Sequence, residues 1–527
     1  MKRTLPDILD TFLENDDGRI CLKCCQVEWN RRDLYENIIK WAQLLKEIGV
    51  KPGDRVGIYL KKSLDEVGVT FAIACIGAVF VNIHQSNKVQ QLQHILQDCD
   101  IHVLTSSSEL IRALGNSLRE LPVKKIIVTG TVDELLFPGN IYSFSESPAP
   151  SETILQRPRI IDDDFATIIY TSGSTGKAKG IIQTHANLVE GAEIISVYVK
   201  NTPRDRVLCL LPLSFDYGLN QLLSGIYAGF PLVLANYLFP LDILNLLQKE
   251  NITGLAGVPT IWLDFLGVLE KHPDVELPML RYITNSGGKL HKPTVERLSS
   301  RLTSTDIYLM YGLTEAFRST YLPPEQLTNQ VESIGKAIPN VEILVINKDG
   351  KECKPKEIGE LVHRGALISK GYWGNAKKTQ EVFQPNPLLP DDMGFSETVV
   401  FSGDLVWRDE EDYLYFVGRK DNMIKSSGHR ISPNVVEETL LKIKGVQNAV
   451  VLGVEDERLG QKIIAFLQVS KDNALSESDY IIFTKTLLPP HMIPSKILLL
   501  EKFPINNNGK VDLNELEKRL VYVCPNV

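Results

Sequence analysis

Long apolar runs are missing from this chain of 527 residues. No stretch approaches the roughly 20 apolar residues that a membrane-spanning helix needs. The N-terminus, MKRTLPDILDTFLENDD, starts basic but soon turns acidic, and it has no continuous apolar segment of signal-peptide length. We therefore predict a cytoplasmic protein that does not associate with membranes.

Basic charge is also scarce. The chain has 57 Lys and Arg residues against 65 Asp and Glu residues, which gives a formal net charge of -8, and neither sign forms long runs. A protein whose main task is gripping nucleic acid usually carries a basic stripe or patch. The charge balance therefore argues against nucleic acid as a partner.

The cysteines lack the companions of a metal site. Cys21 and Cys24 have C-x-x-C spacing, and Cys25 follows, but no second C-x-x-C motif and no paired histidines supply the remaining ligands of a zinc site. These cysteines lie in a β-like segment that runs from Ile20 to Val27. We predict that they are reduced and structural.

Helical and strand-like patterns alternate along most of the chain, without a fixed-period repeat or a low-complexity tract. Apolar spacing predicts a helix over residues 32–48, and short apolar runs predict strands at 55–59, 126–128, 207–211 and 231–235. Because 43% of the residues are hydrophobic, the chain can bury a large core. We expect an α/β fold with more than one domain.

The residue composition of the sequence changes after about residue 417. The stretch GRKDNMIKSSGHR, residues 418–430, is polar and contains glycine, which is typical of a linker. A helical pattern at 433–443 and strand-like runs at 449–454 and 462–468 follow, and then another helix. We predict a small α+β domain joined to the rest by this polar linker.

The stretch TSGSTGKAKG, residues 171–180, lies between apolar runs that predict flanking strands. It is not a Walker A loop, because Gly176-Lys177 is followed by Ala178. Its backbone amides, hydroxyls and lysines offer donors to polyphosphate oxygens, whereas a Ser/Gly surface linker would predict neither lysines nor flanking strands. The candidate phosphate ligands are Thr171, Ser172, Gly173, Ser174, Thr175, Gly176 and Lys179.

This stretch resembles the phosphate loop of the adenylate-forming superfamily, which contains acyl-CoA synthetases, adenylation domains of nonribosomal peptide synthetases and luciferases. The family pattern is approximately [ST]-S-G-[ST]-T-G-x-P-K-G, so Lys179 matches its lysine and Ala178 departs from its proline. Further motifs follow in family order over nearly the whole chain. The resemblance implies a large N-terminal domain, residues 1–420, of doubly wound αβ layers with a small β-barrel-like subdomain. A small mobile α+β domain, residues 421–527, would follow.

The segment MYGLTEA, residues 310–316, matches the family's Y-G-x-T-E core. The resemblance implies that Tyr311 stacks on adenine, that Thr314 binds the α-phosphate and that Glu315 helps to hold Mg2+. A ring, a hydroxyl and a hard carboxylate suit these tasks. The segment SGG at 286–288 fits the family's segment on the other face of adenine, where glycine permits close backbone approach. The glycines concerned are Gly287 and Gly288.

Two motifs near the predicted domain boundary also match. The resemblance of SGDL to the family's T-G-D implies that Asp404 accepts hydrogen bonds from the ribose hydroxyls, and a carboxylate has two oxygens for two donors. Arg419 fits the arginine that follows, on ribose or phosphate. By the same resemblance Asp421 is the hinge, and Gly428 faces the tunnel for the thiol.

The segment NNNGKVD, residues 506–512, resembles the family's N-G-K-[IV]-[DR] motif. The resemblance implies that Lys510 is the mobile catalytic lysine, which bridges the substrate carboxylate and the α-phosphate. Both groups are anionic, so an ammonium between them would stabilise the charge that develops in the transition state.

The stretch LPLSFDYGLNQ, residues 211–221, bears on the substrate. Phe215 stands where many acyl-CoA synthetases of the family carry histidine, and Asp216 resembles the aspartate with which amino-acid-activating members bind the α-ammonium group. A buried Asp216 needs a positive partner. It could instead cap the following helix, and Arg318 could neutralise it, which would weaken the case for an ammonium.

These motifs predict an ATP- and Mg2+-dependent acid–thiol ligase. We favour activation of an amino acid, with L-proline as a candidate, and transfer to the phosphopantetheine thiol of a separate carrier protein. The alternative is an AMP-forming acyl-CoA ligase that acts on an organic or fatty acid, since GHRISPNVVEE, residues 428–438, resembles acyl-CoA synthetases more closely. A luciferase-like oxygenase and a non-catalytic homologue are weaker alternatives.

Overall fold

Two mostly parallel sheets form the larger part of the computed structural model, in which residues 2–15, 17–131, 137, 139–148, 155–171, 178–390, 396–426, 429–456, 458–469 and 475–523 are described. In the seven-stranded sheet only β9 runs antiparallel to its neighbour. Its strands, in spatial order, are β7 (Asn140–Ser143), β6 (Lys125–Thr129), β5 (Val103–Ser107), β3 (Arg55–Tyr59), β4 (Val79–Asn82), β8 (Phe165–Thr171) and β9 (Lys179–Thr184).

The nine-stranded sheet has a parallel centre and antiparallel strands at both edges. The short apolar runs of the sequence form its buried central strands, as expected for parallel strands covered on both faces. Its strands, in spatial order, are β16 (Lys336–Ala337), β15 (Thr320–Leu322), β14 (Asp306–Tyr311), β13 (Tyr282–Asn285), β12 (Gly254–Gly257), β10 (Val207–Cys209), β11 (Leu232–Leu234), β1 (Ile20–Cys24) and β2 (Val27–Asn30).

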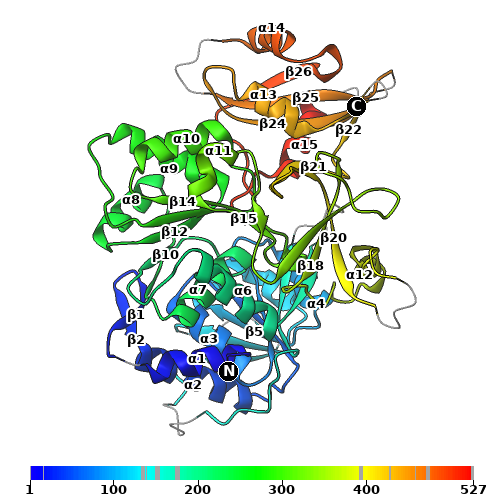
Figure 1. Ribbon diagram of the computed structural model, residues 1–527. Coiled ribbons are helices and arrows are strands. Elements are labelled where there is room, and N and C mark those ends of the chain that lie inside the picture. The colour runs from blue at the N-terminus through cyan, green and yellow to red at the C-terminus, as the bar shows by residue number, and fades with distance from the viewer. Residues whose placement is uncertain are drawn as a thin grey trace.

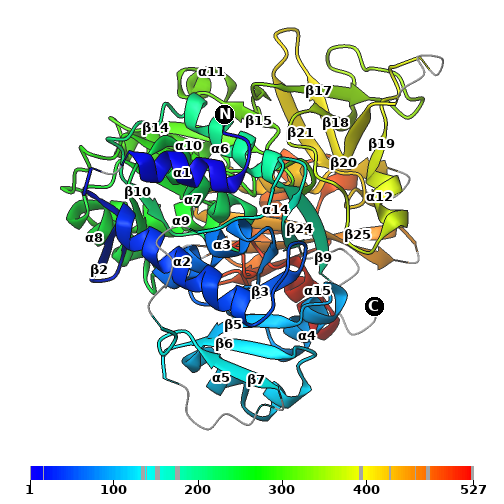
Figure 2. The same cartoon turned by 90° about the horizontal axis from the view of Figure 1, so that it is seen from below.

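A layer of helices lies between these two sheets and shares one hydrophobic core with both (Figure 2). These inner helices are α1 (Leu5–Glu14), α2 (Arg31–Glu47), α3 (Leu64–Cys75), α6 (His185–Tyr198) and α7 (Asp216–Ala228). Other helices cover the outer faces of the sheets: α4 (Val89–Asp98), α5 (Ser108–Leu114) and η1 (Gly115–Glu120) on the seven-stranded sheet, and α8 (Pro240–Lys249), α9 (Pro259–Lys271) and α10 (Lys292–Arg301) on the nine-stranded sheet.

A third sheet, with five antiparallel strands, occupies the place of the predicted barrel-like subdomain. The segment before it contains η2 (Thr314–Ala316), η3 (Pro324–Gln326) and α11 (Leu327–Gln330). The third sheet and its helix comprise β17 (Val341–Ile346), β18 (Gly359–Gly365), α12 (Ala376–Val382), β19 (Phe383–Pro385), β20 (Thr398–Arg408) and β21 (Leu414–Arg419).

The C-terminal part forms a fourth sheet with two hydrophobic clusters of its own, which lies at one end of the molecule in Figure 1. The stretch predicted as a linker, 418–430, is only partly irregular, because two short strands within it extend this sheet. The elements are β22 (Ile424–Ser426), β23 (His429–Ile431), α13 (Pro433–Leu440), β24 (Val446–Asp456), β25 (Gly460–Val469), α14 (Glu477–Leu487), η5 (Pro490–Met492), β26 (Lys496–Leu500) and α15 (Leu513–Val523).

The predicted fold class, α/β layers followed by a small α+β unit, is confirmed. In the described ranges no helix is both long and apolar enough to cross a membrane. The cysteines within those ranges form no disulfide bonds, and no group of three or more metal-ligating side chains gathers there.

Helix α7 packs unusually close to the segment that precedes it. A Cβ atom at Gly218 would lie 2.1 Å from the carbonyl oxygen of Pro212 and 2.8 Å from that of Leu211, and neither backbone atom can move aside easily. Because Gly218 has no side chain, α7 can pack directly against the backbone of residues 211 and 212. This close contact sets the position of α7 and of Asp216, its first residue.

We expect Gly218→Ala to destabilise the protein by about 3 kcal/mol, because the added methyl group overpacks a backbone contact. Gly267→Ala is the matched control, since Gly267 lies in α9 and a Cβ atom there would meet nothing within 4 Å. Helical propensity should stabilise this control variant by roughly 0.5–1 kcal/mol. Thermal denaturation measures both variants. An unchanged melting temperature for Gly218→Ala would contradict the proposed constraint on α7.

Candidate active site

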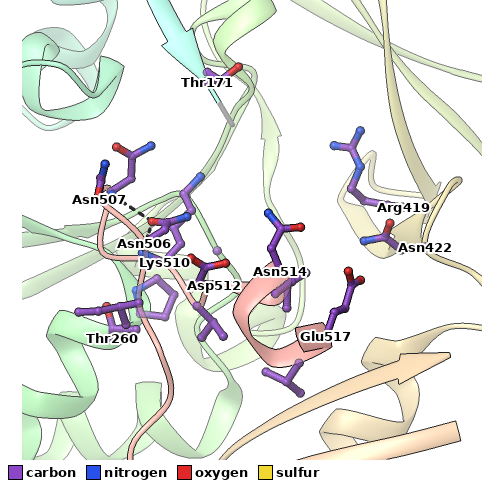
Figure 3. A pocket seen from close by; sticks show the side chains of 18 of the residues that line it. Thr171, Thr260, Arg419, Asn422, Asn506, Asn507, Lys510, Asp512, Asn514 and Glu517 are labelled. Atoms are coloured by element: carbon purple, nitrogen blue, oxygen red, sulfur yellow. Dashed lines mark hydrogen bonds between the residues drawn. The ribbon is translucent and has the colours of Figure 1, made fainter. Parts of the chain in front are cut away.

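A cleft of about 1510 Å³ lies between the N-terminal layers and the C-terminal sheet. Both parts of the chain line it: Thr171 at the end of β8 and Thr260 in α9 come from the N-terminal layers, and Asn506 and Lys510 come from the loop before α15. Figure 3 shows Thr171 and Arg419 across the cleft from this loop. The structure thus brings together predicted site residues that lie more than three hundred positions apart in the sequence.

The loop that carries Lys510 is a tight turn. The Asn506 side chain accepts hydrogen bonds from the backbone amides of Asn508 and Lys510, and the amide of Gly509 donates to the carbonyl of Asn506. Gly509 has a φ of +75°, a conformation that glycine adopts without strain. The N-N-N-G run therefore fixes the backbone from which Lys510 projects.

Three side chains of the N-terminal layers hold this loop, and the sequence analysis missed all of them. The Ser86 hydroxyl donates to the side-chain oxygen of Asn507 over 2.6 Å, and the side-chain nitrogen of Asn507 donates to the side-chain oxygen of Asn87 over 2.6 Å. The hydroxyl of Thr260 donates to the carbonyl of Gly509. No local pattern marks these partners, because they become neighbours of the loop only when the C-terminal sheet docks.

Lys510 reaches the beginning of α7. Its ammonium nitrogen lies 5.2 Å from the centre of the Phe215 ring, and a Cβ atom at Gly287 would come within 2.8 Å of its Cε atom. Burial lowers the pKa of Lys510 and the nearby charge of Arg318 lowers it further, whereas Asp216 raises it. Among the described residues no carboxylate lies within ion-pairing distance, 4.0 Å, of this ammonium group.

Asp216 is a buried carboxylate with 4% of its surface exposed. Its Oδ2 atom accepts a hydrogen bond of 3.0 Å from the Thr314 hydroxyl and lies 4.0 Å from Nη1 of Arg318. Arg318 is buried too, with 3% exposed, and its guanidinium lies 4.9 Å from the centre of the Tyr217 ring. The structure therefore brings together the three predicted residues Asp216, Thr314 and Arg318, of which Asp216 and Arg318 are buried and Thr314 is partly buried.

Tyr311, Asp404 and Arg419 form a second group. The Tyr311 hydroxyl donates to Oδ2 of Asp404, and Nη1 of Arg419 lies 3.2 Å from Oδ1. Burial raises the pKa of Asp404 and Arg419 opposes this effect, while burial and the neighbouring Asp404 raise the pKa of Tyr311. Oδ1 of Asp404 is buried and receives no well-aligned hydrogen bond from the described residues, which suits an acceptor for a ligand hydroxyl.

Glu315 accepts a hydrogen bond from the Tyr372 hydroxyl, and Gln183 donates to the carbonyl of Thr314 over 2.6 Å. The sequence analysis missed Tyr372 and Gln183. They come from a loop beside the third sheet and from β9, so no spacing rule links them to the Thr314-Glu315 pair. Together they fix the short η2 turn on which this pair lies.

The phosphate-loop residues Thr171 and Lys179 face each other across the hairpin of β8 and β9. The carbonyl of Ala178, just before Lys179, lies 2.9 Å from Nε2 of His94. Ser172, Gly173, Ser174, Thr175, Gly176 and Gly428 lie outside the described residues. Gly288 lines the cleft beside Gly287, and the predicted hinge residue Asp421 is exposed in the turn after β21 and also lines the cleft.

Comparison with known proteins identifies the class. The AMP-binding enzyme family matches residues 9–373, and the AMP-binding enzyme C-terminal domain matches residues 435–510. The chain therefore belongs to the AMP-binding enzyme family. The predicted adenylate-forming superfamily and the predicted enzyme class, the AMP-forming acid–thiol ligases, are confirmed.

Individual relatives cover almost the whole chain. An acyl-CoA ligase, sidI, of Aspergillus fumigatus is 28% identical over 520 residues, which are 93% of this chain and 86% of the relative. The crystal structure of the anthranilate CoA ligase AuaEII in complex with anthranoyl-AMP has a TM-score of 0.86 and 25% identity, over 98% of this chain and 97% of that chain. The o-succinylbenzoate coenzyme A synthetase of Bacillus subtilis, in complex with ATP and magnesium ion, has a TM-score of 0.82 and 25% identity, over 97% and 99%.

The lowered pKa of Lys510 predicts a pH-dependent stability. The unfolded chain holds this proton up to the ordinary lysine pKa of 10.5, whereas the folded protein releases it at a lower pH. The wild-type protein therefore gains stability as the pH rises from the lowered pKa to 10.5. Lys510→Met lacks this gain, so we expect it to melt above the wild type at neutral pH and to lose that advantage toward pH 10.5.

Melting temperatures at a series of pH values test this expectation. Lys444→Met is the control, because Lys444 is exposed in the C-terminal part, and its difference from the wild type should not change with pH. A difference between Lys510→Met and the wild type that stays constant across the series would contradict the burial of the ammonium group.

Proposed function

We propose that this protein activates a carboxylic acid with ATP and then transfers the acyl group to a thiol. In the first step a carboxylate oxygen bonds to the α-phosphorus, and the bond to the β-phosphate oxygen breaks, which releases pyrophosphate. In the second step the thiol sulfur bonds to the acyl carbon, its proton is lost, and AMP leaves. The observation that carries the proposal is the position of Lys510 near Asp216 and Arg318, in a cleft that is also lined by Arg419, the ion-pair partner of Asp404.

The nucleotide would bind along the cleft from the β8–β9 hairpin to Asp404. The loop between Thr171 and Lys179 would hold the β- and γ-phosphates, and Asp404 and Arg419 would hold the ribose. Tyr311 would lie on one face of adenine, and the Gly287-Gly288 backbone would lie on the other. The buried Oδ1 of Asp404, which lacks an aligned donor, supports the ribose assignment.

Glu315 would help to hold Mg2+, which when bound neutralises phosphate charge. Its carboxylate already accepts a hydrogen bond from Tyr372, so its orientation is set before any ligand binds. Thr314, whose hydroxyl donates to Asp216, would turn toward the α-phosphate during the reaction.

Lys510 would supply positive charge where the carboxylate and the α-phosphate meet. Two anions repel each other, and an ammonium group fixed between them stabilises the transition state more than the separated reactants. Because burial lowers its pKa, an approaching anion would favour the charged form of Lys510.

We further propose that residues 421–527 move as a unit between the two steps, with Asp421 as the hinge. The separate hydrophobic clusters of the C-terminal sheet support this proposal, because the sheet can move without exposing the core of the N-terminal layers. The contacts between the Lys510 loop and Ser86, Asn87 and Thr260 are polar, so they can break and re-form at modest cost.

The substrate class depends on the charge that Asp216 meets. Arg318 lies close to Asp216 within the same buried group, so the carboxylate has a cationic neighbour before any substrate arrives. This pairing weakens the case for an ammonium partner and favours an acid without an α-amino group, which makes CoA the first thiol acceptor to examine.

A second candidate is the activation of an amino acid, such as L-proline, for a separate carrier protein with a phosphopantetheine arm. One observation favours it: among the described residues, Oδ1 of Asp216 has no hydrogen-bond partner, and it could accept a bond from an α-ammonium group. Phe215 would then form an apolar wall beside the substrate.

We expect Lys510→Ala to lower the rate of acyl-adenylate formation by about 100- to 1000-fold, because a fixed charge at the reacting groups is lost. ATP binding, measured by calorimetry, should change little. Thiol transfer from a supplied acyl-adenylate should persist, since Lys510 acts in the first step alone. Normal ATP–pyrophosphate exchange in this variant would rule out the role of Lys510.

Asp216→Asn distinguishes the two substrate classes in ATP–pyrophosphate exchange with matched amino acids and amine-free acids. With Arg318 as the partner of Asp216, we expect amine-free acids to be preferred, and the preference should persist in the variant. With Asp216 as an ammonium anchor, exchange with the amino acid should be strong in the wild type and lost in the variant. The double variant Asp216→Asn, Arg318→Gln controls for the buried arginine that the single change leaves unpaired.

A further inference from the structure

A buried polar face of α7 lines a small cavity next to the proposed reaction centre. Tyr217, Asn220, Gln221 and Ser224 follow the i, i+3, i+4, i+7 spacing that places side chains on one side of a helix, and all four line the cavity. The cavity measures about 30 Å³ and lies between α6, α7 and the strands β12, β13 and β14. A helix face buried this deeply is normally apolar.

Three polar atoms on this face lack hydrogen-bond partners among the described residues. The side-chain nitrogen of Asn220, the side-chain oxygen of Gln221 and the hydroxyl of Ser224 are buried and make no hydrogen bond with the described residues. These three residues are 2%, 7% and 3% exposed. An unpaired buried polar atom is destabilising because it has lost its hydrogen bonds to water, so three such atoms around one cavity are unfavourable unless a ligand satisfies them.

The cavity lies next to the proposed reaction centre. Tyr217 lines it and directly follows Asp216, and the Tyr217 hydroxyl is hydrogen-bonded to Thr284 of β13. The guanidinium of Arg318 lies over the Tyr217 ring, and its Nε and Nη2 atoms are also buried without partners among the described residues. Unpaired polar atoms therefore occur both on Arg318, which contacts the Tyr217 ring, and on the α7 residues that line the cavity together with Tyr217.

The size of the cavity restricts what it can take. About 10–15 Å³ of such space holds one water molecule, so this cavity has room for about two water-sized groups and none for a long alkyl chain. Its lining offers both donors and acceptors, because amide nitrogen, amide oxygen and hydroxyl groups are all present.

We infer that the acid is short and carries a second oxygen group, a hydroxyl or a second carboxylate, which the polar face of α7 binds. This inference rests on the proposed function, and it names the substrate class. The reacting carboxylate would lie beside Lys510, and the second oxygen group would reach toward Asn220, Gln221 and Ser224.

ATP–pyrophosphate exchange with butyrate, 3-hydroxybutyrate, 4-hydroxybutyrate, succinate and octanoate tests the inference. At least one oxygen-bearing four-carbon acid should exceed butyrate in kcat/KM by about 10-fold or more, because each hydrogen bond to a buried group is worth about a factor of ten. Preference for a hydroxy acid or for succinate identifies the kind of oxygen group. Exchange driven best by butyrate or octanoate would overturn the inference but leave the proposed function intact. No exchange with these five acids would overturn the inference, and no exchange with the amino acids and other amine-free acids as well would overturn the proposed function.

Ser224→Ala should lower the preference for the oxygen-bearing acid over butyrate by about 10-fold while the melting temperature stays equal or rises, since an unpaired hydroxyl is removed. Ser196→Ala is the matched control: Ser196 lies on α6, its hydroxyl is likewise buried without a partner among the described residues, and it does not line the cavity. This control should leave the preference unchanged. An equal preference in Ser224→Ala and the wild type would mean that the cavity holds only ordered water, and the inference would fail.

Discussion

The ammonium group of Lys510 has to lie beside two other buried charges, and the rest of the site depends on this constraint. Asp216 and Arg318 meet at the beginning of α7, and Lys510 comes from the loop between β26 and α15. Burying charge is costly unless opposite charges and hydrogen bonds compensate for it. The region around Lys510 holds two cations and one carboxylate, so it suits an incoming anion, as the proposed reaction requires.

The C-terminal sheet delivers Lys510 through polar contacts of the Asn506–Lys510 loop with the N-terminal layers. These contacts orient the lysine without joining the two hydrophobic cores. The proposed role of Lys510, which would serve one step and be withdrawn for the next, suits such a loop, because a few hydrogen bonds can be exchanged for bonds to water at small net cost. In keeping with this separation of the cores, the C-terminal sheet has two hydrophobic clusters of its own.

Most of the fold could be predicted from the chain because the apolar patterns are strong. The run at 55–59 forms β3 with the predicted bounds, and the helix predicted over 32–48 is α2, shifted by one residue at each end. The strand predicted over 207–211 ends earlier, at Cys209, because the chain turns there toward the close contact of Pro212 with Gly218. The stretch at 418–430 was predicted as a linker, yet it contains two strands, since pairing with β25 outweighs its polar composition.

The sequence by itself determined the family, because its motifs match the family's motifs in residue type and in their order along the chain. Thr171, Lys179, Tyr311, Asp404, Arg419 and Lys510 could all be selected in this way. Only the tertiary structure decided which of them meet and what surrounds them. The pairing of Asp216 with Arg318, the support of the Lys510 loop by Ser86 and Thr260, and the unpaired face of α7 arise between segments far apart in the chain. Burial and charge balance are properties of that assembled environment, so no local pattern could fix them.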